Sequence, residues 1–163
     1  MSKIQKLNNR TLALGIKHLK KVDSDFKEIL RDRNDQINSF KKTGGFEGLI
    51  SLIVEQQLSV ASAKAIFSRV KIVCGDFEAS SFLKIKEDEL KATGLSRQKV
   101  TYCRNVAEAV INKTLDFKKL EKMSDQEVVE ILIKIKGIGE WTAQCYLMAC
   151  MKRLDAWPSS DLG

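Results

Sequence analysis

The sequence predicts an all-α protein, and three observations support this. Apolar residues recur at intervals of three and four, as in residues 49–53 and 128–135, which is the period of a helix with one buried face. The 163 residues include a single proline, Pro158, and proline is the residue that helix interiors tolerate least. Strand-like alternation is almost absent, which argues against a β-rich fold.

The first two helices can be placed from their capping residues. Residues 7–21 follow the pattern of a basic helix, and Asp23 or Ser24 can cap a second helix that ends near Arg33. The polar stretch NDQINSFKKTGG, residues 34–45, is then expected to be a linker.

The rest of the chain is predicted to be helical with short breaks. Ser59 and Ser96 can each cap a long helix, and Ser124 with Glu127 has the spacing of a capping box. We expect helices at residues 46–56, 59–73, 79–85, 87–91, 96–113, 124–135 and 139–151.

Composition limits the kinds of partner and compartment. Lysine and arginine total 28 against 21 aspartates and glutamates, a net charge of +7, which suits a polyanionic partner without identifying one. The cysteines fit neither a zinc nor a ferredoxin spacing, so we expect them to be reduced and buried. We also expect an intracellular, soluble protein, because the sequence shows neither a signal-peptide core nor an apolar run approaching about 18 residues.

The stretch KGIGEWTA, residues 136–143, joins the last two predicted helices by a very tight turn. Glycine tolerates positive φ and lets the backbone approach another molecule closely. Bare amides around Gly137 and Gly139, at the start of a helix, would attract an anion. A nucleic-acid phosphate suits them better than a nucleotide, because no Walker-type lysine is present. Taken alone, an ordinary glycine corner between two helices explains these residues equally well.

Three segments together resemble the helix-hairpin-helix DNA glycosylase superfamily, and specifically its alkylation-repair branch, the 3-methyladenine DNA glycosylase II type. They are GGFEGLISLIVEQQLSVASAKAIFSRV, GLSRQKVTYCRNVA and LIKIKGIGEWTAQCYLMACMKRLDAWPSSDLG, in the family's order. The resemblance implies a monofunctional glycosylase of base excision repair. Such an enzyme flips alkylated purines of the 3-methyladenine and 7-methylguanine type out of duplex DNA and hydrolyses their bond to deoxyribose.

The resemblance assigns the catalytic carboxylate to Asp161. Cleavage passes through an oxocarbenium-like sugar, which one negative charge near the anomeric carbon would stabilise. The alternative is a solvated turn aspartate that caps a helix. Asp155, the other nearby carboxylate, is interpreted as a structural cap or salt-bridge partner. The site has no obvious general acid, which suits leaving groups that already carry positive charge.

Trp141 is expected to form the base pocket, because a flipped cationic purine favours an aromatic face; without the resemblance, Trp141 would be interpreted as a core residue. Bifunctional relatives carry a Schiff-base lysine at this position, so lyase chemistry is not expected. Some alkyladenine glycosylases carry a tyrosine four residues later. Here Cys145 stands there, with Tyr146 beside it on another side of the helix, which indicates a roomier pocket.

Gln56 and Gln57 are both candidates to fill the gap that the everted base leaves, and the sequence does not choose between them. The alternative is a pair of polar loop residues ahead of the helix that Ser59 caps. The remaining DNA-binding residues implied by the resemblance are Gly137, Ile138, Gly139 and Thr142.

No cofactor is expected to be required. By resemblance, the backbone carbonyls of Ile133, Ile135 and Ile138 hold a structural Na⁺ or K⁺ that bridges to a DNA phosphate.

The expected architecture has two helical lobes around a cleft, with the hairpin at their junction. A bundle of residues 44–138 faces a lobe made of the N-terminal helices, residues 1–43, and of residues 139–163, which include the second hairpin helix and the catalytic loop. We expect this C-terminal lobe to be incomplete at Gly163.

The expected partner is damaged double-stranded DNA, and no membrane association is expected. We expect a monomer, located in the cytoplasm (nucleoid-associated) if the protein is bacterial and in the nucleus if it is eukaryotic. The alternatives are a non-catalytic helix-hairpin-helix DNA-binding module and a glycosylase for another lesion, such as uracil or hypoxanthine.

Overall fold

The computed structural model describes residues 6–32 and 42–159, and over these ranges the protein is helical, as predicted. Its only pairing of strand type there is an isolated antiparallel bridge between Lys6 and Arg153. The helices are α1 (Asn9–Val22), α2 (Ser24–Asp32), α3 (Gly45–Glu55), α4 (Val60–Cys74), α5 (Ala79–Lys84), α6 (Glu87–Ala92), α7 (Arg97–Ile111), α8 (Phe117–Leu120), α9 (Asp125–Leu132) and α10 (Glu140–Cys145), followed by a π-helix, η1 (Tyr146–Cys150).

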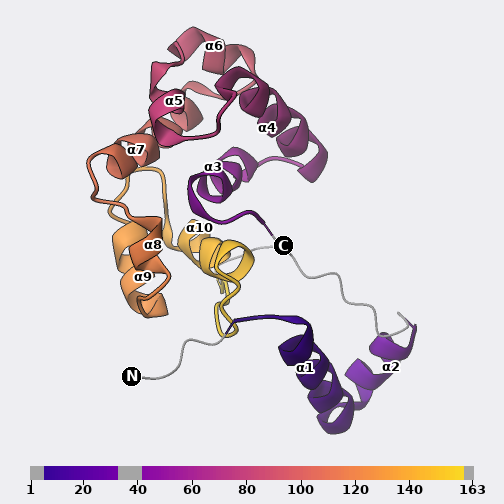
Figure 1. Ribbon diagram of the computed structural model, residues 1–163. Helices are drawn as coiled ribbons and strands as arrows, with labels where there is room; N and C mark the ends of the chain where they lie inside the picture. The colour runs from indigo at the N-terminus through magenta and orange to yellow at the C-terminus, as the bar shows by residue number, and fades with distance from the viewer. Residues whose placement is uncertain (1–5, 33–41, 160–163) are drawn as a thin grey trace.

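Helix α3 lies at the centre of the main bundle (Figure 1). It packs against α4, α7, α10 and η1, and residues 48–54 are all buried. A helix that is apolar all round must be covered on several sides. Phe46 at its start also meets the rings of Phe77 and Phe82, with centroids 5.9 and 5.8 Å apart. Because α3 is fixed so completely, the loop after it has a rigid base.

Helices α1 and α2 pack on each other and stand apart from the other helices (Figure 1). Asp23 caps α2, accepting from the amides of Asp25 (2.8 Å) and Phe26 (3.2 Å). The pair is joined to the body where the amide of Leu7 donates to the carbonyl of Lys152 (2.7 Å), beside the Lys6–Arg153 bridge. The expected lobe of residues 1–43 with 139–163 stays a prediction, because residues 160–163 lie outside the described ranges.

The C-terminal helix differs from the single helix predicted at 139–151. It is α-helical only to Cys145 and then widens to π geometry, in which the amide of Met151 bonds to the carbonyl of Tyr146 (3.0 Å). Side-chain periodicity in the sequence does not report such a change of backbone pitch. π-Helical turns are frequent near functional sites, and this one lies directly after the hairpin.

All four cysteines are buried and none forms a disulfide, as expected. Burial raises the pKa of the Cys103 and Cys150 thiols to about 12 in each case, so these thiols are protonated and unreactive at neutral pH. Within the described part of the chain, no helix is long and apolar enough to span a bilayer.

Candidate functional site

The hairpin between α9 and α10 exposes backbone amides at the start of α10. Gly139 is the N-cap residue, with extended backbone (φ −92°, ψ 175°), and no side chain caps the helix. The amide of Ile138 is used inside the turn, donating to the carbonyl of Ile135 (3.0 Å), and the Ile138 side chain is buried. Amides in the first turn of a helix have no partner within the helix. The hairpin therefore presents donors to an external acceptor.

The two hairpin glycines serve different purposes. Gly137 has φ +107°, and a Cβ there would overlap the ring of Tyr102 on α7. Gly139 has ordinary extended φ, and a Cβ there would meet nothing within 4 Å. Gly137 is thus required by the fold, whereas Gly139 leaves open space in front of the helix. The sequence pattern alone does not separate them.

The turn between α3 and α4 is a type II β-turn with an unusual residue in it. The amide of Leu58 donates to the carbonyl of Glu55 (3.1 Å), Gln56 has φ −49° and ψ 124°, and Gln57 has φ +56°. A type II turn needs positive φ at its third residue, where glycine or asparagine is usual. A glutamine in this conformation is strained, and such strain tends to occur at functional sites.

Gln56 joins this turn to the hairpin. Its Nε2 donates to the carbonyl of Gly137 (3.2 Å) and to Oγ1 of Thr142 (3.0 Å). Thr142 is buried, so its hydroxyl is enclosed with Gln56, whereas Gln57 is exposed. Two segments far apart in sequence, the α3–α4 turn and the hairpin, therefore form one surface, and Gln57 is the glutamine available to a ligand on it.

Trp141 is half-buried and packs against the hydrophobic core. Cys145, one turn further along α10, is buried. Tyr146 is directed into the fold: its hydroxyl accepts a hydrogen bond from the amide of Gly45 (3.0 Å), and its ring lies 6.0 Å from that of Phe117. Burial raises the pKa of Tyr146, so it stays protonated. The prediction that Tyr146 lies on another side than Trp141 agrees with these contacts.

The predicted cation site consists of backbone carbonyls in the turn. The carbonyl of Ile135 already accepts from the amide of Ile138 but has a second lone pair. Ile133, which would supply another of these carbonyls, is an exposed residue (46%). Among the described residues, no group of three or more His, Cys, Asp or Glu side chains could hold a metal ion. Backbone carbonyl oxygens can replace the hydration shell of a monovalent cation such as K⁺.

Asp161 lies outside the described residues, but the segment leading to it is held by a buried arginine. Nη2 of Arg153 donates to the carbonyls of Leu120 (3.4 Å) and Met123 (3.0 Å), and Nη1 lies 3.4 Å from Asp125. Sequence reasoning missed Arg153; an arginine within three residues of the end of an apolar helix was the available signal. Asp155, predicted to be a cap or salt-bridge partner, is exposed and has neither role among the described residues.

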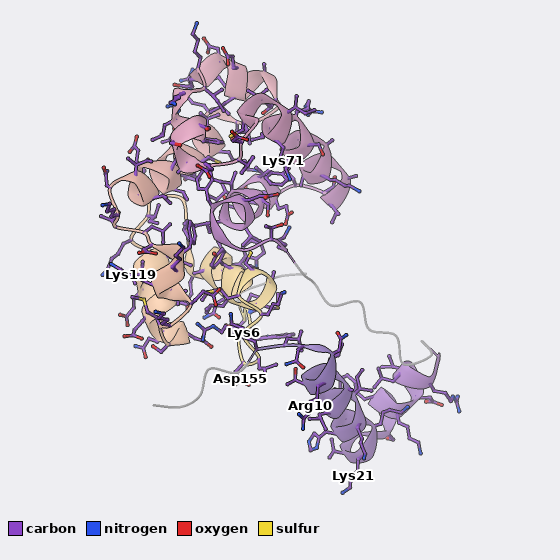
Figure 2. The ribbon with its side chains drawn as sticks, viewed as in Figure 1. Lys6, Arg10, Lys21, Lys71, Lys119 and Asp155 are labelled. Carbon is purple, nitrogen blue, oxygen red and sulfur yellow. The ribbon has the colours of Figure 1, made fainter. Side chains whose placement is uncertain are left out.

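Positive charge does not mark the site. Figure 2 shows Arg10 and Lys21 together on α1, with Lys71 and Lys119 on other parts of the molecule. Lys71 also lies 2.6 Å from Glu47, and Lys6 pairs with Glu121, so part of the charge is locally compensated. The shared surface of the turn and the hairpin is a better guide to function than the net charge.

Comparisons with known proteins agree with this geometry. A family model described as "HhH-GPD superfamily base excision DNA repair protein" matches residues 50–162. DNA-3-methyladenine glycosylase 1 of Schizosaccharomyces pombe is 33% identical over 151 residues, which cover 89% of this chain and 66% of that protein. DNA-3-methyladenine glycosylase of Saccharomyces cerevisiae is 35% identical over 132 residues, 72% of this chain and 43% of that protein.

Among solved structures, the S. pombe 3-methyladenine DNA glycosylase in complex with abasic DNA superposes with a TM-score of 0.81 at 30% identity. The match covers 90% of this chain and 74% of that one. The chain spans less than two thirds of the length of both yeast proteins found by sequence.

Proposed function

Because this chain belongs to the HhH-GPD superfamily of base excision DNA repair proteins, we propose that it is a monofunctional DNA glycosylase of the 3-methyladenine DNA glycosylase II type. It flips alkylated purines out of damaged duplex DNA and removes them by hydrolysis, in the nucleus or nucleoid where genomic DNA lies. The names of the yeast relatives support the substrate class. The observation that carries the proposal is the bond from Gln56 to the hairpin, which joins two nucleic-acid-facing segments into one surface.

The hairpin anchors one DNA strand. A phosphate oxygen accepts from the amides at Gly139 and the following residues, where the helix dipole adds attraction. A Na⁺ or K⁺ held by the carbonyls of Ile133, Ile135 and Ile138 would supply positive charge to the same phosphate. Phosphate contacts fix the position of the duplex but do not read its sequence. This suits an enzyme that must act on lesions in any sequence.

Gln57 fills the gap in the duplex after the base has left. It is exposed on the shared surface, whereas Gln56 is held by Gly137 and Thr142. A glutamine carries both donors and acceptors, so it can bond to whichever base loses its partner. Thr142 then acts by fixing Gln56 rather than by touching DNA.

Trp141 forms one wall of the base pocket. An alkylated purine such as 3-methyladenine is cationic, and a tryptophan face attracts a cation by about 0.5–2 kcal/mol. Cys145 lies one turn away, and its small side chain leaves a roomier pocket than a tyrosine would. The cationic base is also a good leaving group without protonation, so the carboxylate of Asp161 is the essential charged group: it stabilises the oxocarbenium-like sugar.

The direct test is excision from duplexes that each carry one defined lesion. The full-length protein is incubated with DNA containing 7-methylguanine, a 3-methyladenine analogue, uracil or hypoxanthine, and abasic sites are detected by alkali cleavage. Alkali-dependent breaks at the alkylated purines alone are expected. Breaks only at uracil or hypoxanthine would reassign the lesion, and binding without any breaks would indicate a non-catalytic DNA-binding module.

Gly139→Asp is expected to weaken DNA binding at least tenfold for damaged and undamaged duplexes alike. The new carboxylate would stand where the phosphate approaches, and open space at this position means that no other group is disturbed. Gly139→Asn is the matched control. Aspartate and asparagine both cap a helix well and change its stability relative to glycine by only about a few tenths of a kcal/mol, but asparagine carries no charge. Equal affinities for the two variants, measured by fluorescence anisotropy, would rule out the phosphate contact.

Sodium borohydride is not expected to trap a covalent complex between this protein and lesion DNA. Trapping needs a lysine amine that forms a Schiff base with the sugar, and Trp141 occupies the position of that lysine. A bifunctional glycosylase serves as the positive control. A trapped band that depends on the lesion would show lyase chemistry, and Lys136, on the other side of the corner, would be the first residue to substitute.

A further inference from the structure

We propose that Lys99 is a positioning residue for Gln57: its ammonium holds the peptide unit between Gln56 and Gln57 in the orientation that keeps Gln57 at the surface. This inference rests on the proposed role of Gln57 in filling the gap in the duplex. Lys99 belongs to α7 and has no part in the fold or mechanism described above.

The contacts of Lys99 single it out among the lysines. Its Nζ donates to the carbonyl of Val54 (2.7 Å) and to that of Gln56 (2.7 Å). Carbonyls at the end of a helix lack partners within the helix and carry the negative end of its dipole. Lys99 is half-buried, and burial lowers its pKa. Among the described residues Lys99 forms no ion pair, and it is partly withdrawn from water to bind two backbone carbonyls.

The bond to the Gln56 carbonyl selects the type of turn. Types I and II differ mainly by a rotation of about 180° of the central peptide unit, which reverses the direction of its carbonyl. In a type I turn Gln57 would relax to negative φ, and the Gln56 carbonyl would point away from Lys99. Hydrogen bonds from an ionised donor are roughly twice as strong as neutral ones. The ammonium therefore opposes the relaxation that the strained φ of +56° at Gln57 favours.

The turn is held from two sides. Gln56 is fixed to the hairpin through its side chain and to Lys99 through its backbone. Without Lys99 the side-chain bonds of Gln56 can survive while the peptide after it rotates. The consequence is specific: Gln57 loses its defined position, whereas the hairpin and its phosphate contact stay in place.

The test compares Lys99→Met, Gln57→Ala and the double variant, with Lys122→Met, an exposed lysine outside the turn and the hairpin, as control. Base flipping is followed by 2-aminopurine fluorescence next to the lesion, together with single-turnover excision. Lys99→Met and Gln57→Ala are each expected to reduce both by roughly tenfold, and the double variant is expected to be no worse than either, as for coupled neighbours. The defects are expected to shrink when the lesion faces a mismatched base, because such a base flips more easily.

The outcomes are separable. If Gln57→Ala flips and excises normally, the proposed role of Gln57 is wrong. If Gln57→Ala is defective but Lys99→Met behaves like Lys122→Met, the positioning role of Lys99 is overturned. It is also overturned if the fold-reduction in the double variant equals the product of the fold-reductions in Lys99→Met and Gln57→Ala. A defect of Lys99→Met that is the same for paired and mismatched lesions would also overturn it, because general loss of structure does not depend on pairing. Should Lys99→Met fail to fold, Lys99→Gln, which keeps an N–H donor group but not the charge, enters the same comparison.

Discussion

Asp161→Asn is expected to slow single-turnover excision of 7-methylguanine by about 10²–10³-fold, equivalent to roughly 3–4 kcal/mol of transition-state stabilisation. Asparagine keeps the size and much of the hydrogen bonding of aspartate but removes the charge that the oxocarbenium-like sugar needs. Binding to a duplex with an abasic-site mimic is expected to be retained or to tighten, because a negative charge near the phosphates has gone. Both quantities are measured on the full-length protein.

Asp155→Asn is the matched control for this prediction. The two aspartates lie in the same C-terminal segment, and Asp155 is exposed and has no salt bridge among the described residues. Excision by Asp155→Asn is expected to stay within about threefold of the parent protein, as for a surface substitution. If Asp161→Asn also stayed within that range, the chemistry would lie elsewhere, and loss of binding together with folding would mark Asp161 as structural.

The helices could be predicted largely because their start signals are local. Ser59, Ser96 and Ser124 cap α4, α7 and α9, and the capping box of Ser124 with Glu127 is present, so these three starts are confirmed. The end of α9 was predicted three residues too late, at Ile135. Ile135 bonds instead to the carbonyl of Leu132 (3.0 Å) as the chain enters the hairpin.

Two elements could not be predicted because the periodicity of apolar residues does not reveal them. Helix α8 is a single four-residue turn, too short to show an apolar pattern; the side chain of Asp116 caps it. The π-helix has the same kind of apolar residues as an α-helix. What distinguishes it is the backbone bond from Met151 to Tyr146, which tertiary packing decides.

The candidate site was predicted as a list of residues but not as an arrangement. The choice between Gln56 and Gln57 depends on contacts across 81 and 86 positions of sequence, from Gln56 to Gly137 and Thr142. The hydrogen bonds from Lys99 to the carbonyls of Gln56 and Val54 span 43 and 45 positions. Contacts between residues so far apart cannot be detected from the local spacing of residue types. The hairpin glycines can be detected in this way, because a tight turn requires glycine within a few residues of sequence.

Gly137→Ala is expected to lower the free energy of unfolding by about 2–6 kcal/mol. A non-glycine residue forced to a sparsely populated φ costs about 1–3 kcal/mol, and the new methyl group adds an overpacking cost of about 1–3 kcal/mol. Both apply here, since φ is +107° and the Cβ would overlap the ring of Tyr102. Urea unfolding followed by circular dichroism measures the change, with the slope m checked for constancy.

Gly139→Ala makes the comparison specific, because it adds the same methyl group two residues away. Its φ is ordinary and a Cβ meets nothing within 4 Å, so the loss is expected to be about 1 kcal/mol or less, from weaker helix capping alone. In the double variant Gly137→Ala/Tyr102→Ala the ring is absent, so the free-energy cost of overpacking should disappear while the cost of the positive φ remains. The two single losses of stability should therefore not add in the double variant. Equal losses for Gly137→Ala and Gly139→Ala would mean that the hairpin is held by something other than the left-handed turn at Gly137 and its contact with Tyr102.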